Sequence, residues 1–553
     1  MIKTSNGAAA LLAAMSLSSP AWADSLTAGV VRDNFNIGNY VTGLNGTGPT
    51  DIRFLPDGRA IIIQKGGQVM VRTTGGMMVL AGSFPVDTES EKGLLGVEIH
   101  PDFATTKTLF FYYSRAAGGM DPGSDLDRHR VVSITLGDDN KLVASSETIL
   151  VRGLRGPLNH DGGGLSLGND GKLYIGVGDT GCNSGKTPGG VDSIGNYFGT
   201  CLTNGNGKIL RVNLDGSIPT DNPLAGLTAV TACGGDCKSA PGSNTGPPRK
   251  DIYAWGFRNP FRIWSDPQTG LLWVGDVGEV TREEISIVRK GRHYGWPWRE
   301  GFVGFPPDRC KAIVPDTGDC EDPVYDCMHD GCESITGGVI IDACTWPAAF
   351  RGVYVFGDAV NGSISILDVN AARDGVVANS VQRFAQIDGG APVAFRVGPD
   401  GGLYIVVYNP SGGRVARILP KTSAMCSPLD AAVPDAPVDA PVAGGDGPPA
   451  GGDGPGAGSD ARPVDAAAGS EAGVGSDAAG TGGRAGSGGG SGGGGGSSGG
   501  AGGSGGGGSA GSGGSAGSGG CGCAVTGGLP PLLGGSLVLA AMAASRLLRR
   551  RRP

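Results

Sequence analysis

Short apolar runs that alternate with polar residues dominate the chain from residue 51 to residue 420. The same unit recurs: an alternating run, a turn of Pro, Asp, Asn or Gly, and a second run that often carries Leu-Tyr or Val-Tyr. Asp-Gly between two alternating runs is a strong signal for a β-hairpin. The six copies of the unit, three of them with Asp-Gly at the turn, are Ile52–Ile63, Val97–Tyr112, Leu165–Val177, Ile263–Val274, Val339–Phe356 and Phe395–Val407. No stretch has the period of a long amphipathic helix, so the pattern predicts an all-β protein.

Antiparallel units that repeat every 40–90 residues or so predict a six-bladed β-propeller, with one hairpin in each blade. A ring buries both faces of each sheet and leaves few open edges. A β-sandwich is the alternative, but it uses about 100 residues for seven strands, and here six units extend over about 370 residues. The spacing is irregular because of inserts. We interpret the largest, residues 182–250, as a disulfide-braced loop on the top face, where loops carry function.

Composition limits the part of the chain that can fold. Glycine accounts for 106 of the 553 residues, and residues 427–520 are rich in glycine and contain no aromatic residue. A segment without large apolar side chains cannot bury enough surface to offset its ordering entropy. We therefore assign residues 24–426 to the propeller and residues 427–520 to a disordered linker. The net charge of −8 argues against a nucleic-acid partner, because such binding needs a basic face.

The twelve cysteines favour disulfide bonds over zinc. Several are close neighbours in sequence, and neither a Cys-x-x-Cys pair nor a set of histidines accompanies them. The pairs that we expect are Cys182/Cys201, Cys233/Cys237, Cys310/Cys320, Cys327/Cys332 and Cys344/Cys426.

Both ends of the chain carry targeting signals. Lys3, a short apolar run and the cleavage motif Ala21-Trp22-Ala23 predict a secretory signal peptide over residues 1–23. Residues 521–553 join Cys521-Gly-Cys523 to an apolar helix long enough to span a membrane and to an arginine cluster. This order resembles the MYXO-CTERM sorting tails of myxobacterial surface proteins. The resemblance implies a sorting protease and retention at the cell surface, and a plain C-terminal membrane anchor is the alternative.

A series of short motifs lies between and within the hairpins. They include Lys92-Gly-Leu-Leu-Gly96, Asn159-His160-Asp-Gly-Gly163, Gly178-Asp-Thr-Gly181, Trp255-Gly-Phe-Arg-Asn-Pro260, Gly275-Asp-Val-Gly-Glu279 and Tyr294-Gly-Trp-Pro297. Their order and spacing resemble the glucose/sorbosone dehydrogenase family, the soluble PQQ-dependent sugar dehydrogenases, over roughly residues 40–420. The resemblance implies a six-bladed propeller, PQQ and Ca²⁺ as cofactors, and a small-molecule sugar or polyol as substrate.

Three residues are candidates for catalysis: His160, Arg258 and Asn259. A neutral imidazole near pH 7 can accept a proton from a sugar hydroxyl, and His160 lies in a tight glycine-rich loop. An arginine supplies a fixed cation for a developing oxyanion. The resemblance implies that His160 is the general base and that the Arg-Asn pair lies beside the cofactor. The alternatives are a loop histidine bonded to a carbonyl and an arginine that braces a blade.

The resemblance also implies the binding residues. Cofactor contacts fall on Glu91, Asn159, Thr180, Arg258 and Asn259, where Glu91 replaces a glutamine of the family and Asn159 an aspartate. The backbone carbonyls of Gly278 and Glu279 match the pair that holds calcium under the quinone. Glu284 and Tyr294 match positions around a structural calcium site, and the oxygen-rich surroundings suit a hard cation. A solvated acidic loop is the alternative.

Three cations of the family are missing from this chain. The lysine and two arginines that grip the three carboxylates of PQQ align with Val360, Ala391 and Val393. At about 1.5–3 kcal/mol for each charged hydrogen bond, their loss predicts weaker binding. Arg351 and Arg396 are candidates to replace them, although their spacing in the sequence does not locate either one at the cofactor.

The sequence therefore supports two classes of function. The first is an exported, surface-tethered quinoprotein oxidoreductase that oxidises a sugar or polyol hydroxyl and passes hydride to PQQ. The second is a non-catalytic, calcium-stabilised propeller that binds a glycan or a protein. A lactone-hydrolysing propeller finds no matching motif.

Overall fold

The computed structural model describes residues 24–44, 46–156, 159–181, 196–232, 245–304 and 320–422. The expected signal peptide, linker and C-terminal sorting segment lie outside these residues. Within the described ranges the α-helices are short, α1 (Val30–Asn34) and α2 (Phe103–Thr106), and no helix is long and apolar enough to cross a membrane.

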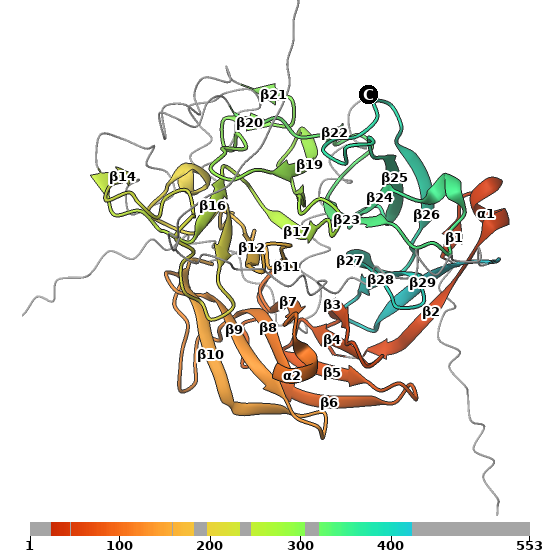
Figure 1. The fold of residues 1–553 in the computed structure, drawn as a ribbon, viewed down its shortest axis with the longest axis horizontal. Helices are drawn as coiled ribbons and strands as arrows, with labels where there is room; N and C mark the ends of the chain where they lie inside the picture. The colour runs from red at the N-terminus through yellow and green to blue at the C-terminus, as the bar shows by residue number, and fades with distance from the viewer. Residues whose placement is uncertain are drawn as a thin grey trace, which may run out of the picture. The chain divides into compact units, whose positions relative to one another are not determined.

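Six antiparallel sheets surround a common centre, and this arrangement confirms the six-bladed propeller (Figure 1). The first blade comprises β3 (Pro49–Phe54), β4 (Ala60–Gln64), β5 (Gln68–Arg72) and β6 (Met78–Ser83), and the second β7 (Leu94–Ile99), β8 (Thr108–Ser114), β9 (His129–Leu136) and β10 (Leu142–Leu154). The third comprises β11 (Leu165–Leu167), β12 (Leu173–Val177), β13 (Lys208–Val212) and β16 (Ile252–Trp255), and the fourth β17 (Pro260–Ser265), β18 (Leu272–Asp276), β19 (Arg282–Val288) and β22 (Tyr325–Met328). The fifth comprises β23 (Ile335–Ile341), β24 (Val353–Asp358), β25 (Ser363–Asp368) and β26 (Gln382–Gln386), extended by β1 (Ser25–Leu26). The sixth comprises β27 (Ala391–Val397), β28 (Leu403–Tyr408), β29 (Gly413–Pro420) and β2 (Phe35–Leu44). Two-stranded ribbons form from β14 (Val230–Thr231) with β15 (Thr245–Gly246), and from β20 (Arg299–Glu300) with β21 (Val303–Gly304).

Each predicted hairpin supplies the first two strands of one blade. Antiparallel pairing joins β3 to β4, β7 to β8 and so on around the ring. The first strands β3, β7, β11, β17, β23 and β27 lie around the centre of Figure 1. Because every blade repeats the same strand order, the segments that precede these inner strands meet at one end of the ring.

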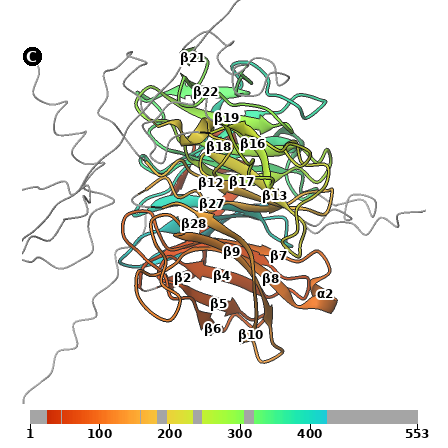
Figure 2. The same cartoon turned by 90° about the vertical axis from the view of Figure 1, so that its left-hand side faces the viewer.

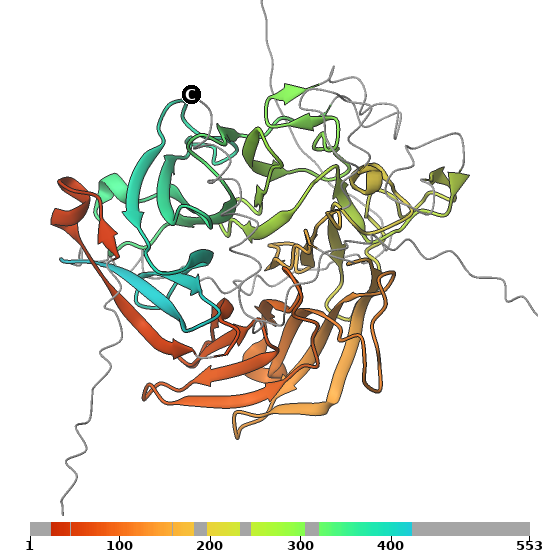
Figure 3. The ribbon, with the colours of Figure 1, turned by 180° about the vertical axis from the view of Figure 1, so that it is seen from behind.

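The ring closes with the start of the chain. Strand β2 pairs with β29 in antiparallel register from Phe35 opposite Pro420 to Leu44 opposite Gly413. Figure 3 shows the red β2 beside the cyan β29 at the edge of the ring. In the view turned by 90° the orange strands of the first two blades lie below the green strands of the fourth (Figure 2).

The core lies between neighbouring blades, where the apolar residues of the hairpins are buried. Trp273 of the fourth blade stacks on Tyr354 of the fifth with ring centroids 4.8 Å apart. Phe35 packs on Trp346 at 4.6 Å, so the closing strand is anchored by aromatic contact as well as by hydrogen bonds.

The interpretation of residues 182–250 as one loop was wrong in part. Strand β13 falls inside this range, pairs with β12 and is buried throughout. Its two charged residues, Lys208 and Arg211, are both buried. Lys208 donates to the carbonyls of Phe198, Gly199 and Asn206 at 2.6–2.9 Å, and Arg211 bonds Asp170.

One expected disulfide is seen in full. Cys327 and Cys332 are bonded, with Cα atoms 5.9 Å apart, which confirms that pair. Cys201, Cys320 and Cys344 are also disulfide-bonded. The partners expected for these three lie outside the described residues, as do both members of the Cys233/Cys237 pair.

Candidate active site

The candidate residues lie on segments that lead into inner strands of three consecutive blades. Glu91 precedes β7, His160 precedes β11, and Arg258 with Asn259 precedes β17. These segments meet at the end of the ring where the inner strands begin, and hydrogen bonds join them there.

His160 forms a buried pair with Asp179. The imidazole Nδ1 lies 2.7 Å from Asp179 Oδ1, and His160 is only 5% exposed. With Nδ1–H donated to the carboxylate, Nε2 carries the lone pair that can accept a proton. Both the position and the tautomer of the imidazole are therefore set by one carboxylate.

Asp179 is fully buried and accepts four hydrogen bonds. Besides His160, its donors are the Gly181 amide at 2.9 Å, Asn196 Nδ2 at 2.6 Å and Trp296 Nε1 at 2.7 Å. Burial opposes ionisation, but the hydrogen bond from His160, the positive charge of Arg258 and the hydrogen bond from the Gly181 amide outweigh it. The pKa of Asp179 therefore lies below its ordinary value.

Close backbone packing fixes the loop that carries His160. A Cβ on Gly178 would lie 1.8 Å from the His160 carbonyl oxygen, so this position admits only glycine. The His160 amide donates to Glu91 Oε2 at 2.9 Å. His160 and Thr180 both have positive φ, 56° and 76°, and a β-branched residue in this region is strained, a feature that clusters at functional sites.

Asn259 links the same three segments. Its Nδ2 donates to Glu91 Oε2 at 3.3 Å, and its Oδ1 accepts from the Gly162 amide at 3.1 Å. The structure thus brings Glu91, His160 and Asn259 together. Glu91 and Asn259 act on each other and on the loop of His160.

Arg258 reaches the same cluster from the fourth blade. Its Nη1 donates to the Val277 carbonyl at 2.9 Å, and its guanidinium lies 5.6 Å from the ring of Trp296, which in turn bonds Asp179. Its Nε has no partner among the described residues, although Arg258 is 7% exposed.

The other two expected cofactor contacts are Asn159 and Thr180. Gly181 admits the side chain of Asn159, because a Cβ there would lie 1.7 Å from Asn159 Oδ1. Thr180 is 1% exposed, and its hydroxyl has no partner within the described ranges. A buried hydroxyl without a partner is costly and marks a place for a ligand atom or water.

A second acidic region underlies the Arg-Asn pair. Asp276 accepts hydrogen bonds from the amides of Arg258 at 3.1 Å and Asn259 at 2.7 Å. Burial raises the pKa of Asp276 to about 7. Opposite it in the β18–β19 ladder is Glu284, whose pKa is raised well above its ordinary value by burial and by the charge of Asp276.

The turn after Asp276 orients two backbone carbonyls. The amides of Glu279 and Val280 both donate to Glu300 Oε1. In a trans peptide the carbonyl points opposite to the amide of the next residue. The carbonyls of Gly278 and Glu279 therefore both point away from Glu300, so they are presented together as a pair of oxygen ligands.

Glu284 and Tyr294, the residues expected around a structural calcium site, form hydrogen bonds with different backbone groups. Tyr294 donates to the Ile287 carbonyl at 2.7 Å, whereas Glu284 accepts from the Gly301 amide. No group of three or more His, Cys, Asp or Glu side chains in the described part of the chain is arranged to hold a metal ion.

Neither candidate substitute for the missing cations is available. Arg396 bonds Asp51 at 3.1 Å and its own neighbour's carbonyl at 2.6 Å. Arg351 bonds the carbonyls of Trp346 and Cys344 at 2.6 and 2.7 Å. At the aligned positions, Ala391 and Val393 belong to an apolar cluster of the first and sixth blades.

Asp179 and Trp296 are site residues that the sequence reasoning missed. Both lie inside motifs that the analysis had singled out, Gly178-Asp-Thr-Gly181 and Tyr294-Gly-Trp-Pro297. A carboxylate between glycines, in a segment shared with a candidate base, was the available signal for Asp179.

The fold and this site define a six-bladed β-propeller with a buried aspartate–histidine pair at the start of its inner strands. Residues 47–417 match the Glucose / Sorbosone dehydrogenase family, and the chain belongs to that family. It is 26% identical over 385 residues to aldose sugar dehydrogenase YliI of Escherichia coli, covering 68% of this chain and 90% of the relative. It is 27% identical over 275 residues to quinoprotein glucose dehydrogenase B of Acinetobacter calcoaceticus, covering 47% and 50%.

A solved structure agrees with the fold. The PQQ-bound aldose sugar dehydrogenase of Streptomyces coelicolor superposes with a TM-score of 0.51 at 21% identity, over 70% of this chain and 98% of that one. The family and these relatives are dehydrogenases, which places the chain with the oxidoreductases.

Proposed function

We propose that this protein is an exported quinoprotein dehydrogenase that oxidises a hydroxyl-bearing carbon of an aldose or polyol. The observation that carries the proposal is the buried His160–Asp179 pair, held beside Arg258 by the segments of three blades. The dehydrogenases to which the chain is similar support the substrate class.

The side chains divide the work of one two-electron oxidation. Asp179 holds Nδ1–H of His160, and His160 Nε2 takes the proton of the substrate hydroxyl as hydride leaves its carbon. Arg258 supplies positive charge toward the oxygen that becomes the carbonyl. Glu91 and Asn259 hold the loop of His160 in register, so the base does not have to reorganise.

Part of the site fits PQQ. The partnerless Thr180 hydroxyl and Arg258 Nε are buried polar atoms available to a polar ligand. When bound, PQQ supplies the acceptor for the hydride. The three aligned positions for its carboxylates carry Val360, Ala391 and Val393, so the cofactor would be held through Thr180 and the Arg-Asn pair, with lower affinity than a full cationic grip gives.

The carbonyls of Gly278 and Glu279 are the proposed calcium ligands. Their shared direction and the nearby carboxylates Asp276 and Glu284 suit a hard divalent cation. Calcium would place positive charge next to the acceptor.

We also propose export and attachment to the cell surface. The signal-like residues 1–23 and the tail 521–553 support this location, and disulfide-bonded cysteines fit an oxidising compartment. A sorting protease and a C-terminal membrane helix are parts of the same proposal.

Titration of the purified protein with PQQ and CaCl₂ tests the function. The proposal expects saturable PQQ binding that requires calcium, and dye-linked oxidation of an aldose or polyol. If calcium raises the melting temperature but PQQ neither binds nor supports turnover, the protein is a non-catalytic binding propeller, the alternative that the absent cations favour.

A further inference from the structure

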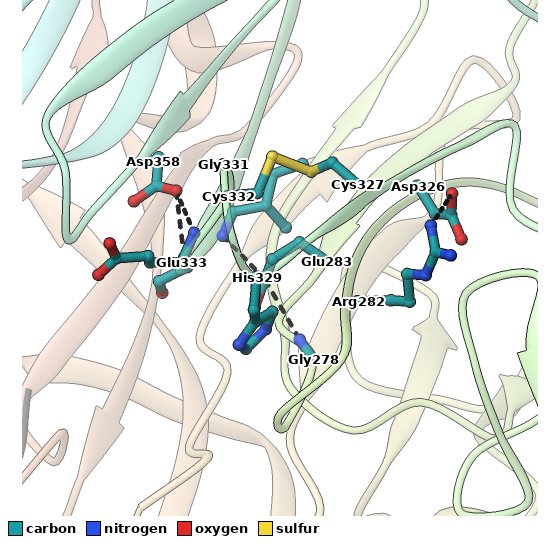
Figure 4. The surroundings of a disulfide bond; sticks show 12 residues. Gly278, Arg282, Glu283, Asp326, Cys327, His329, Gly331, Cys332, Glu333 and Asp358 are labelled. Carbon is teal, nitrogen blue, oxygen red and sulfur yellow. Dashed lines mark hydrogen bonds and ion pairs between the residues drawn. A yellow bond between two sulfur atoms is a disulfide. The ribbon is translucent and has the colours of Figure 1, made fainter. Parts of the chain in front are cut away.

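A loop closed by a disulfide bond lies beside the turn that carries the proposed calcium ligands (Figure 4). The loop begins at Cys327 and ends at Cys332, which the disulfide joins. Within it, the amides of Gly331 and Cys332 both donate to the Met328 carbonyl at 3.0 Å. The His329 amide donates to the Thr281 carbonyl at 3.2 Å, so the loop touches the β18–β19 turn directly.

Open space flanks this loop on two sides. A cavity of about 260 Å³ is lined in part by Cys327, Gly331 and Cys332, and another of about 390 Å³ by Met328, His329 and Asp330. A segment with so little packing around it owes its shape mainly to its own turn and to the covalent bridge.

His329 connects the loop to a buried carboxylate. Its Nε2 lies 2.6 Å from Glu283 Oε1, and Glu283 is fully buried. The second oxygen, Glu283 Oε2, accepts from the Gly278 amide at 3.2 Å and from the Ile335 amide at 2.9 Å. Glu283 therefore joins the disulfide loop, the turn and the first strand of the next blade.

The backbone at the Gly278 end of the turn is sterically restricted. A Cβ on Gly278 would lie 1.5 Å from the Arg282 carbonyl oxygen. Glu300 fixes the far side of the turn through the amides of residues 279–281. Glu283 fixes the near side, so the direction of the two carbonyls depends on where Glu283 is held.

We propose that the disulfide loop Cys327–Cys332 positions the Gly278–Glu279 turn through His329 and Glu283, so that full affinity for a divalent cation is reached only when the disulfide is formed. His329 is a positioning residue in this scheme. Without the bridge the loop samples more conformations, the contact between His329 and Glu283 is lost for part of the time, and a buried carboxylate is left without its strongest partner. This inference rests on the proposed calcium site.

The test is calcium affinity, measured by calorimetry on chelator-stripped protein, together with the calcium-dependent shift in melting temperature. His329→Ala should weaken calcium binding by about 10- to 100-fold, the usual cost of losing a residue that helps to orient the ligands of a metal. His329→Gln keeps an N–H donor toward Glu283 and should recover most of the affinity. His100→Ala, a histidine of the second blade that accepts a hydrogen bond from the Asp102 amide, is the matched control and should stay within twofold of wild type.

The double variant Cys327→Ser/Cys332→Ser separates a general loss of stability from loss of the proposed positioning of the turn by the disulfide loop through His329 and Glu283, here called the clamp. It should weaken calcium binding to the same degree as His329→Ala, and the triple variant should be no worse, because both changes act through one contact. Additive losses, or affinities equal to wild type in both variants, would overturn the clamp and leave the proposed function intact. No calcium-dependent shift in wild type would overturn the calcium site and the clamp together.

A variant that does not fold is replaced by a milder one. Glu283→Gln keeps the volume of the side chain and removes the charge that faces His329. If Glu283→Gln melts cooperatively and binds calcium as tightly as wild type, the positioning role is refuted.

Discussion

Replacing Asp179 by asparagine tests the core of the site with the smallest change of shape. All four partners of the carboxylate are donors in the arrangement that leaves His160 Nε2 unprotonated: His160 Nδ1, the Gly181 amide, Asn196 Nδ2 and Trp296 Nε1. An asparagine has one oxygen to offer, and its NH₂ group must face one of the two donor pairs. The least costly response is for His160 to become the acceptor at Nδ1, which moves its proton to Nε2.

This exchange removes the base without removing the imidazole. The corresponding change in a serine-protease triad lowers kcat by about 10⁴ because the wrong tautomer is held. We expect a fall of about 10²–10⁴ in kcat for sugar oxidation, with a smaller change in KM, because substrate contacts other than the base are retained. The loss of charge-assisted hydrogen bonds, at about 1.5–3 kcal/mol each, should also lower the free energy of unfolding.

Dye-linked turnover at saturating cofactor and thermal melting are measured on the same preparations. Asp170→Asn is the matched control, since Asp170 lies in the β11–β12 turn of the same blade and bonds Tyr174 and Arg211. An Asp179→Asn protein that melts cooperatively and turns over within threefold of wild type would refute the pairing as the basis of catalysis.

Four further changes have defined outcomes. Gly278→Ala should abolish the calcium-dependent rise in melting temperature, because its Cβ would lie 1.5 Å from a backbone carbonyl oxygen; calorimetry with CaCl₂ checks this. Val360→Lys should tighten PQQ binding about tenfold or more by restoring one charged contact, as measured by fluorescence titration, whereas Val377→Lys on the exposed surface should not. Burial lowers the pKa of His293 from 6.5 to about 3, so the neutral form is the folded one. Its contribution to stability is complete above pH 6.5 and is lost as the pH falls toward 3. The stability advantage of wild type over His293→Asn in denaturant titrations should therefore shrink over that range, and a constant difference would contradict the reasoning. Deleting residues 521–553 should release the protein into the medium, and a truncated form that stays with the cells would exclude the sorting tail.

The fold could be predicted from the sequence because propeller hairpins are local. Asp57-Gly58, Asp170-Gly171 or Asp400-Gly401 closes its hairpin whatever the rest of the chain does, and the six alternating pairs of runs fix the blade number. Strand β13 was missed because its charged residue Lys208 is buried against three carbonyls of the preceding segment, those of Phe198, Gly199 and Asn206. A lysine in the sequence gives no sign of such burial.

The site could be predicted only where a functional residue lies inside a short motif that marks it in the sequence. His160 and Asn259 were found because glycine-rich and Arg-Asn motifs mark them. Asp179 and Trp296 were missed because their role is set by distance in space: Trp296 reaches Asp179 across 117 residues of sequence. The role of Glu283 has the same origin, since His329 is 46 residues away.

Ring closure by β2 has a consequence for the growing chain. Among the described strands β2 pairs with β29 alone, so from the time residues 35–44 are made until residues 413–420 are available they form an edge with nothing beside it. An exposed edge strand invites pairing with other chains. The sequence of β2 opposes this: only Phe35, Val41 and Leu44 of its ten residues are buried in the finished ring, and Asn36, Gly38 and Asn39 interrupt the apolar run. The strand that remains unpaired during synthesis thus has few apolar residues with which to bind another chain. Substitution of Asn36, Gly38 and Asn39 by valine should favour aggregation during synthesis more than it alters the finished propeller.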